Sequence, residues 1–138
     1  MNDQVIVSLR AAALADCERV WQWNFADDVR AMSNDPTIVA LATHAAWYVD
    51  RIAKGAIWIV EHEGEDVGVV RIDSGRISIA LAPGARGRGV GKRAIAAACA
   101  AWGGPVVAQI RNDNQPSRAA FEACGFVSNG RETYEWRP

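Results

Sequence analysis

A glycine-rich stretch with basic residues lies near the middle of the chain and leads directly into an alanine-rich segment. It runs from Ala82 to Gly104 and reads APGARGRGVGKRAIAAACAAWGG. Glycines let several backbone N–H groups converge on a bound group without interference from a Cβ atom, and the N-terminus of a following helix carries partial positive charge. This stretch therefore predicts a phosphate site.

The loop does not match the Walker A motif GxxxxGK[ST]. Arg86 stands where the first glycine is required, and Arg93 follows Lys92 in place of Ser or Thr. A P-loop nucleotide site is therefore excluded.

Two other glycine patterns fit the loop better. The dinucleotide fingerprint GxGxxG/A is met by GVGKRA from Gly89, but it needs an acid about 20 residues later, where Arg111 lies. The pattern R/Q-x-x-G-x-G/A is met by Arg86, Gly89 and Gly91. A strand–helix turn with no ligand stays open at this point.

A second motif follows the glycine loop along the chain. The segment NDNQPSRAAFEACGF contains N-x-x-S-x-x-x-F-x-x-x-G-F between Asn114 and Phe126. In this order, the loop and the second motif resemble the GNAT superfamily of acyl-CoA-dependent N-acyltransferases. The resemblance is specific over roughly the C-terminal half of the chain.

The resemblance implies a site for acetyl-CoA and no metal. In this family the pantetheine arm lies in a notch between two neighbouring parallel strands, which here are 77–81 and 106–111. Main-chain groups of the first strand pair with it, the loop holds the pyrophosphate, and the asparagine binds the pantetheine. The expected cofactor-binding residues are Ile79, Ala80, Leu81, Arg86, Gly87, Arg88, Gly89, Val90, Gly91, Lys92, Asn114 and Ser117.

The usual acid and base of the family are both missing. Many members carry a tyrosine seven residues after the asparagine, where this chain has Phe121, and a glutamate on the strand RISIAL, which has none. We expect Tyr134 and His44 to be the replacement catalytic groups. Release of the thiolate with help from solvent, and loss of catalysis, stay open as alternatives.

The N-terminal third of the chain indicates which class of acceptor to expect. The segments VWQWNFADDVRAM and THAAWY resemble amino-sugar N-acetyltransferases that act on UDP-linked sugars in pseudaminic acid synthesis. The resemblance implies that aromatic rings stack on a sugar or base and that Arg30 meets a phosphate. The tryptophans can instead fill the core. The expected substrate-binding residues are Trp21, Trp23, Arg30, His44 and Trp47.

The function expected from these motifs is transfer of an acetyl group from acetyl-CoA to a primary amine. The favoured acceptor is a nucleotide-linked amino sugar. A protein N-terminus, another small amine, or a CoA-binding module without turnover are the alternatives. A homodimer with Trp136 at its contact is a further expectation.

The elements that must position these residues follow from hydrophobic periodicity. Strands are predicted at 5–9, 56–62, 66–73, 76–81 and 106–111, with a closing hairpin around Asn129 and Gly130. Helices are predicted from Asp16, over 25–32, over 44–54 with Thr43 as N-cap, after the loop, and over 116–124. The result is one α+β domain spanning 1–138, with a mostly antiparallel sheet, one splayed parallel pair, and helices on both faces.

Composition limits the choice of partner and compartment. The net charge is −1 and 22% of residues are charged, so neither nucleic acid nor a membrane is expected as partner. The three cysteines have no metal-ligand spacing and are odd in number, and the N-terminus lacks the features of a signal peptide. A reduced, cytoplasmic protein is expected.

Overall fold

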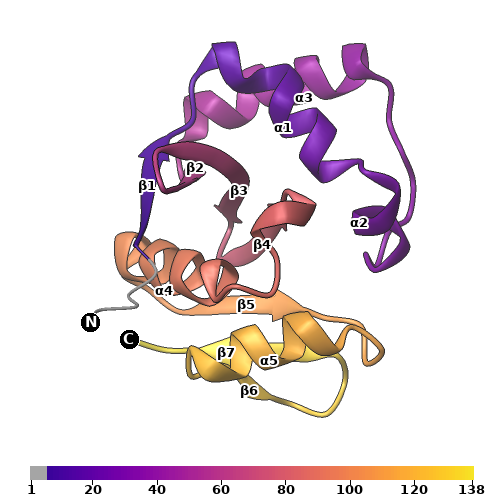
Figure 1. Ribbon diagram of the computed structural model, residues 1–138. Coiled ribbons are helices and arrows are strands. Elements are labelled where there is room, and N and C mark those ends of the chain that lie inside the picture. Colours follow the sequence, from indigo (N-terminus) through magenta and orange to yellow (C-terminus); the bar gives the residue numbers. More distant parts are fainter. Residues whose placement is uncertain (1–5) are drawn as a thin grey trace.

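The computed structural model describes residues 6–138 and contains a seven-stranded sheet with helices around it (Figure 1). The strands are β1 (Val7–Ala11), β2 (Ile57–His62), β3 (Glu65–Asp73), β4 (Arg76–Leu81), β5 (Val106–Gln109), β6 (Val127–Ser128) and β7 (Thr133–Trp136). The α-helices are α1 (Cys17–Asn24), α2 (Asp27–Ala31), α3 (Leu41–Lys54), α4 (Val90–Trp102) and α5 (Gln115–Ala123), with 3₁₀ turns at Leu14–Asp16 and Pro83–Ala85.

The sheet is antiparallel except at its centre. Its strand order is β1-β2-β3-β4-β5-β7-β6, and only β4 and β5 run parallel. These two strands are paired at a single position, Arg76 opposite Val107, and separate beyond it. The predicted α+β fold, with one splayed parallel pair in a mostly antiparallel sheet, is therefore confirmed.

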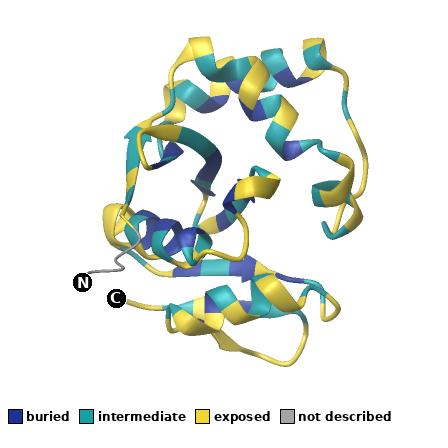
Figure 2. Ribbon diagram, in the orientation of Figure 1, coloured by how far each residue is buried: buried dark blue, intermediate teal, exposed yellow. Residues whose placement is uncertain are grey.

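Helices cover both faces of the sheet because its central strands are apolar on both sides. On one face Val70 and Ile72 of β3 pack with Ala94 and Ile95 of α4. On the other face α1 and α3 cover a smaller cluster of Val20, Tyr48, Ile57, Ile59, Val69 and Ala80. Figure 2 shows this burial as dark segments along the sheet and on the inner side of α4.

Glycines set both ends of α4. Gly89 precedes the helix with a φ of 76°, and Gly103 ends it with a φ of 79°. Both values lie in the left-handed region that residues with a Cβ atom avoid. The glycines that suggested a phosphate loop therefore also fix where α4 begins.

Several predicted boundaries differ from the structure: β5 ends at Gln109 instead of 111, and α2 covers Asp27–Ala31 within the predicted 25–32. The third helix begins at Leu41 with Ala40 as N-cap, so Thr43 lies inside the first turn and caps nothing. The chain is extended up to Ala40, and the His44 N–H already donates to the Ala40 carbonyl. The first strand begins at Val7, and Val5 of the predicted strand lies outside the described residues.

Within the part of the chain that the structure describes, no helix is long and apolar enough to cross a lipid bilayer.

Gly68 allows β3 to lie unusually close to β4. A Cβ atom at this position would lie 2.4 Å from the Ala80 carbonyl oxygen and 3.1 Å from the Leu81 Cα atom. We expect Gly68→Ala to lower the free energy of unfolding by about 1–3 kcal/mol, since backbone atoms must move. Urea denaturation measures this.

The matched control is Gly84→Ala. A Cβ atom at Gly84 meets nothing within 4 Å, so this variant should unfold within about 0.5 kcal/mol of the wild type. Equal effects of the two substitutions would contradict the close approach of β3 and β4.

Candidate active site

Two adjoining cavities meet where β4 and β5 separate. The larger, called the loop cavity, has a volume of about 660 Å³ and is bounded by β4, the glycine loop, α4 and α5. The smaller, called the inner cavity, has a volume of about 270 Å³ and extends toward α1, α2 and β3. Both contain Val29, Met32, Ser33, Ile79, Ala80, Asn114, Ser117 and Phe121 in their walls, so these residues form the shared boundary.

One edge of β4 presents main-chain groups without strand partners to the loop cavity. Ala82 donates to Val67 on the β3 side, and Gly75 accepts from Val107 on the β5 side. Since main-chain groups alternate between the two edges of a strand, those of Ile79 and Leu81 face the gap beside β5. This edge can pair with an extended ligand.

Ala80 is oriented the other way. By the same alternation its main-chain groups face β3, opposite Val69. Its side chain is buried and lies in the walls of both cavities. The predicted contact of Ala80 with the cofactor is therefore limited to its methyl group.

The glycine loop offers several free N–H groups at the N-terminus of α4. Gly87 and Gly89 have φ values of 72° and 76°. The first intrahelical bond of α4 is donated by Arg93 to Gly89, so the N–H groups before it have no partner in the helix. Free N–H groups and the helix dipole together suit an anion.

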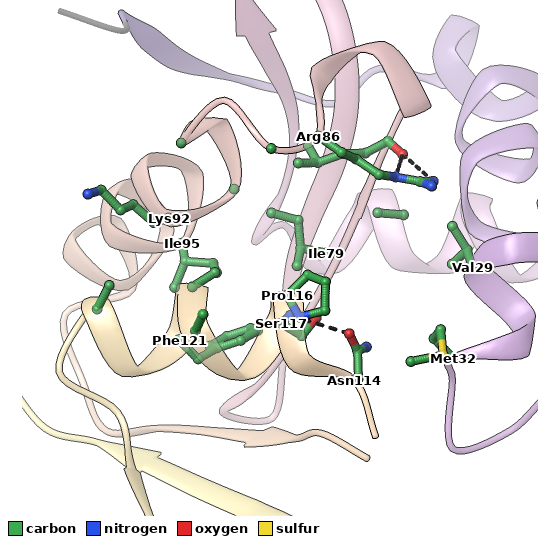
Figure 3. Close-up of a pocket in the computed structure, with 18 of the residues that line it drawn as sticks. Val29, Met32, Ile79, Arg86, Lys92, Ile95, Asn114, Pro116, Ser117 and Phe121 are labelled. Atoms are coloured by element: carbon green, nitrogen blue, oxygen red, sulfur yellow. Dashed lines mark hydrogen bonds between the residues drawn. The ribbon is translucent and has the colours of Figure 1, made fainter. Parts of the chain in front are cut away.

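Arg86 connects the loop to α2 across the mouth of the loop cavity. Its Nε and Nη2 donate to the Leu81 carbonyl at 3.2 and 2.9 Å, and its Nη1 donates to Asp28. Figure 3 shows Arg86 above Ile79, with the bonds to Leu81 as dashed lines. The Arg86 guanidinium lowers the pKa of Asp28 below its usual value.

Asn114 both caps α5 and borders the cavities. Its Oδ1 accepts from the Ser117 N–H at 3.3 Å, which leaves its amide NH₂ free to donate. Phe121, seven residues further along the chain on α5, is 4% exposed and packs edge-on against Phe126. Figure 3 shows Asn114, Ser117 and Phe121 along one side of α5, facing Ile79.

Most predicted cofactor residues come together around the loop cavity, but two do not. Arg88 is exposed and outside the cavity wall, and Val90 is fully buried in the core below α4. Val90 can contribute only its main-chain N–H. The predicted cofactor residues that do line the loop cavity are Ile79, Ala80, Leu81, Arg86, Gly87, Gly89, Gly91, Lys92, Asn114 and Ser117.

The two predicted catalytic side chains are outside both cavities. His44 is 2% exposed, its Nε2 lies 3.1 Å from the Cys17 carbonyl, and its ring stacks on Tyr48. Tyr134 is 3% exposed and its hydroxyl accepts from Arg118 Nε at 3.1 Å. The geometry gives no support to a catalytic or substrate-binding role for His44, or to a catalytic role for Tyr134.

The predicted acceptor tryptophans are engaged within the fold. Trp21 Nε1 donates to the Val39 carbonyl at 2.9 Å, Trp23 packs against the α1–α3 cluster, and Trp47 packs on it as well. None of the three lines either cavity. Trp136, the predicted dimer contact, stacks on Phe126.

Arg30 does line the inner cavity, together with charged residues that the sequence analysis missed. Arg71 on β3 and Arg76 on β4 are in the same wall, and Asp28 lies in the wall of the loop cavity. Alternation in the strand DVGVVRID places Arg71 on the face of Val69, which was a usable signal. Burial lowers the pKa of both Arg30 and Arg71.

A metal site is not formed among residues 6–138, where no three His, Cys, Asp or Glu side chains come together.

Comparison with known proteins identifies the family. Residues 7–127 match the family model described as an acetyltransferase (GNAT) domain. The chain belongs to the GNAT acetyltransferase family. It is accordingly an acetyl-CoA-dependent N-acetyltransferase.

Solved structures share the GNAT fold at low sequence identity. An aminoglycoside acetyltransferase, AAC(6')-Ib, in complex with coenzyme A matches with a TM-score of 0.78 and 16% identity over 96% of this chain and 95% of that chain. Spermidine N-acetyltransferase from Vibrio cholerae, in complex with CoA and spermine, has a TM-score of 0.77 and 19% identity over 94% and 91%. The yncA protein of Salmonella typhimurium with acetyl-CoA has a TM-score of 0.72 and 20% identity over 96% and 94%.

A search of curated protein sequences finds no significant match. None of the three structures is described as acting on a nucleotide-linked sugar. The comparisons thus support the GNAT family and leave the narrower resemblance to pseudaminic acid enzymes without support.

The burial of His44 has a consequence for stability. Desolvation is the main cause that lowers its pKa below 6.5, with the nearby Arg71 charge adding to it. The unfolded chain therefore binds a proton that the folded chain does not, and stability decreases as pH falls below about 6.5. Urea unfolding at pH 7, 6 and 5 measures this decrease.

The variant His44→Gln removes the titrating group. We expect its stability to change less than that of the wild type between pH 6.5 and 5, although its absolute stability is lower because the buried imidazole is lost. The same pH dependence in both proteins would contradict the assigned environment of His44.

Proposed function

We propose that the protein acetylates the primary amine of a small molecule, with acetyl-CoA in the loop cavity and the amine in the inner cavity. The observation that carries this proposal is the shared boundary of the two cavities beside the free edge of β4. A thioester at that edge would face the inner cavity. Ligands on opposite sides of one gap can react without a large movement of the chain.

The loop cavity has the chemistry that acetyl-CoA requires. Main-chain groups of Ile79 and Leu81 pair with the amides of the pantetheine arm as an added strand. The N–H groups of the loop, from Gly87 to Lys92, hold the pyrophosphate, and the Lys92 ammonium adds charge. Asn114 donates its free amide to the pantetheine.

Transfer requires a neutral amine, an acceptor for the proton that the amine loses, and a proton for the CoA thiolate. The nitrogen lone pair forms a bond to the acetyl carbon as the carbon–sulfur bond breaks, and an N–H of Ile79 or Leu81 stabilises the carbonyl oxygen. The amine loses one proton to water, and the CoA thiolate takes one up. In this proposal Ser117, which lines both cavities, donates a hydrogen bond to the departing sulfur.

The described cavities hold no strong general base. The carboxylates in their walls are Asp28 and Asp35, and the pKa of each is lowered, for Asp28 by Arg86 and for Asp35 by hydrogen bonds from Thr37. No histidine or cysteine of residues 6–138 lines either cavity. We infer that the amine must arrive unprotonated or lose its proton to ordered water.

A small amine is the favoured acceptor. The relatives named above include acetyltransferases of an aminoglycoside and of spermidine, both small amines. The inner cavity, about 270 Å³, is of a size for a small molecule. The nucleotide-linked amino sugar and the protein N-terminus stay as alternative acceptors, and the first of these is included in the assays below.

Acetyl-CoA should stabilise the protein, and one loop substitution should abolish this effect. At 100 times its dissociation constant, a ligand adds about 2.7 kcal/mol, a thermal shift of several degrees. Gly91→Glu places a carboxylate at the loop cavity in the first turn of α4, where a negative charge suits the helix but repels pyrophosphate. Thermal unfolding with and without acetyl-CoA measures both effects.

The control is Gly91→Ala, whose added methyl group would lie 3.5 Å from Leu81 Cδ1 in ordinary contact. This variant should keep the shift with acetyl-CoA, and ATP or NAD should give no shift with any protein. A shift retained by Gly91→Glu, or seen equally with ATP, would contradict the assignment of the loop.

The rate should depend on the protonation of the acceptor. Because Asp28 and Asp35 are ionised well below neutral pH, kcat/KM should rise about tenfold per pH unit up to the pKa of the acceptor amine. Initial rates of thiol release between pH 6 and 10 measure this. A plateau that begins at the same pH for amines of different basicity would instead reveal an enzyme base.

A further inference from the structure

The inner cavity is rich in arginine and poor in carboxylate. Arg30 from α2, Arg71 from β3 and Arg76 from β4 line it, and Asp35 is the single acidic residue among the described residues in its wall. Cationic side chains in a partly closed cavity attract anions strongly because solvent screening is reduced. The positive charge of the inner cavity therefore influences which amines can bind there.

Arg71 is held in place but lacks a counterion. Its guanidinium lies 5.0 Å from the centre of the Trp47 ring, on the sheet face covered by α1 and α3. Its Nε is buried without a hydrogen-bond partner, and no ion pair to Arg71 is formed within residues 6–138. Burial is the main cause that lowers its pKa.

Arg30 has a similar environment. Its guanidinium lies 4.9 Å from the Phe25 ring, its Nη1 donates to the Asp35 carbonyl at 3.0 Å, and its Nε is buried without a partner. Arg30 is close enough to Arg71 for its charge to contribute to the lowered pKa of Arg71. Two neighbouring, partly buried cations without an anion between them are costly.

The nearby carboxylates of the described residues form no ion pair with either arginine. The charge of Asp35 acts on Arg30, but its Oδ1 accepts from the Thr37 N–H at 3.0 Å. Asp73, two residues after Arg71 on β3, lies 2.8 Å from Arg51 and outside the cavity wall, although its charge reaches Arg71. The two arginines therefore keep unsatisfied donors that an incoming oxyanion can accept.

We propose that the acceptor is a small primary amine that also carries a carboxylate or a phosphate, and that Arg30 and Arg71 bind this anionic group. This inference rests on the proposed function, since it names the acceptor class of the same site. Guanidinium groups bind carboxylate and phosphate through paired N–H donors, and their ring contacts fix the planes of both groups.

The position of the arginines also orients the amine. Both arginines line only the inner cavity, whereas Ile79 and Ser117 line the inner cavity and the loop cavity. An acceptor bound by its anion at the arginines extends its amine toward that shared boundary. Polycationic amines would instead place further positive charge beside Arg30 and Arg71.

Matched acceptor pairs test the proposal. Thiol release from acetyl-CoA is measured for a set of amino acids, each compared with its amide, and for O-phosphoethanolamine compared with ethanolamine. Each rate is divided by the concentration of the unprotonated amine. A UDP-linked amino sugar, spermidine and kanamycin complete the panel. We expect an anionic member to exceed its uncharged counterpart in kcat/KM by about 10- to 100-fold. The amino acid pairs test whether the bound anion is a carboxylate, and the O-phosphoethanolamine pair tests whether it is a phosphate.

Substitution assigns the preference to residues. Arg71→Gln and Arg30→Gln should reduce kcat/KM for the best anionic acceptor about 10- to 100-fold through a raised KM, and should change its uncharged counterpart little. Arg131→Gln, at an exposed position far along the chain in the last hairpin, is the matched control and should change neither. Stabilisation by acetyl-CoA should be the same in all four proteins.

A binding measurement separates this inference from the proposed function. Thermal shifts with CoA present are compared for the N-acetylated anionic compounds and their amides on the wild type, which requires no turnover and no variant. Suppose that the acids give thermal shifts, the amides give none, and no amine supports thiol release. This result would overturn the proposed function and leave the anion site supported. Equal rates and equal shifts for acids and amides, or a preference for spermidine or kanamycin, would overturn the anion site.

Discussion

The separation of β4 from β5 is the constraint on which the rest of the structure depends. The strands are paired only at Arg76 and Val107, which leaves main-chain groups of Ile79 and Leu81 without strand partners. Main-chain groups away from water need hydrogen-bond partners, and a strand with a free edge provides a ready template for one. In an acetyl-CoA-dependent enzyme, an extended cofactor arm can supply that partner.

The helices border the two ends of this gap, and each end has a different chemical character. α4 crosses between β4 and β5 and begins where Gly89 turns the chain, so its free N–H groups point at one end of the gap. α5 begins at Asn114, which borders both cavities while it caps the helix. At the other end, Arg30 of α2 and Arg71 of β3 line the inner cavity. In the proposed arrangement, cofactor and acceptor meet where β4 and β5 separate.

The sequence was informative where a residue type has a single physical purpose. Glycines with positive φ, such as Gly87 and Gly89, act locally, so their spacing alone predicted the loop. The helix predicted from Pro116 begins one residue earlier, at Gln115, with Asn114 as its N-cap. The catalytic roles predicted for His44 and Tyr134 depend on burial, which the sequence did not reveal. The spacing of His44 and Tyr48 on one helix is compatible with their stacking, but no local pattern showed that Tyr134 would face Arg118. Arg71 was missed because a charged residue within an apolar strand reveals its partners only after α3 packs on the sheet.

Amide hydrogen exchange with and without saturating acetyl-CoA tests the role of the open strand edge most directly. The account predicts slower exchange at the Ile79 and Leu81 amides and at the amides of residues 87–92, with little change at Ala80, whose N–H already faces β3. Protection confined to other parts of the chain, or equal protection of Ile79 and Ala80, would contradict a cofactor bound along the free edge of β4.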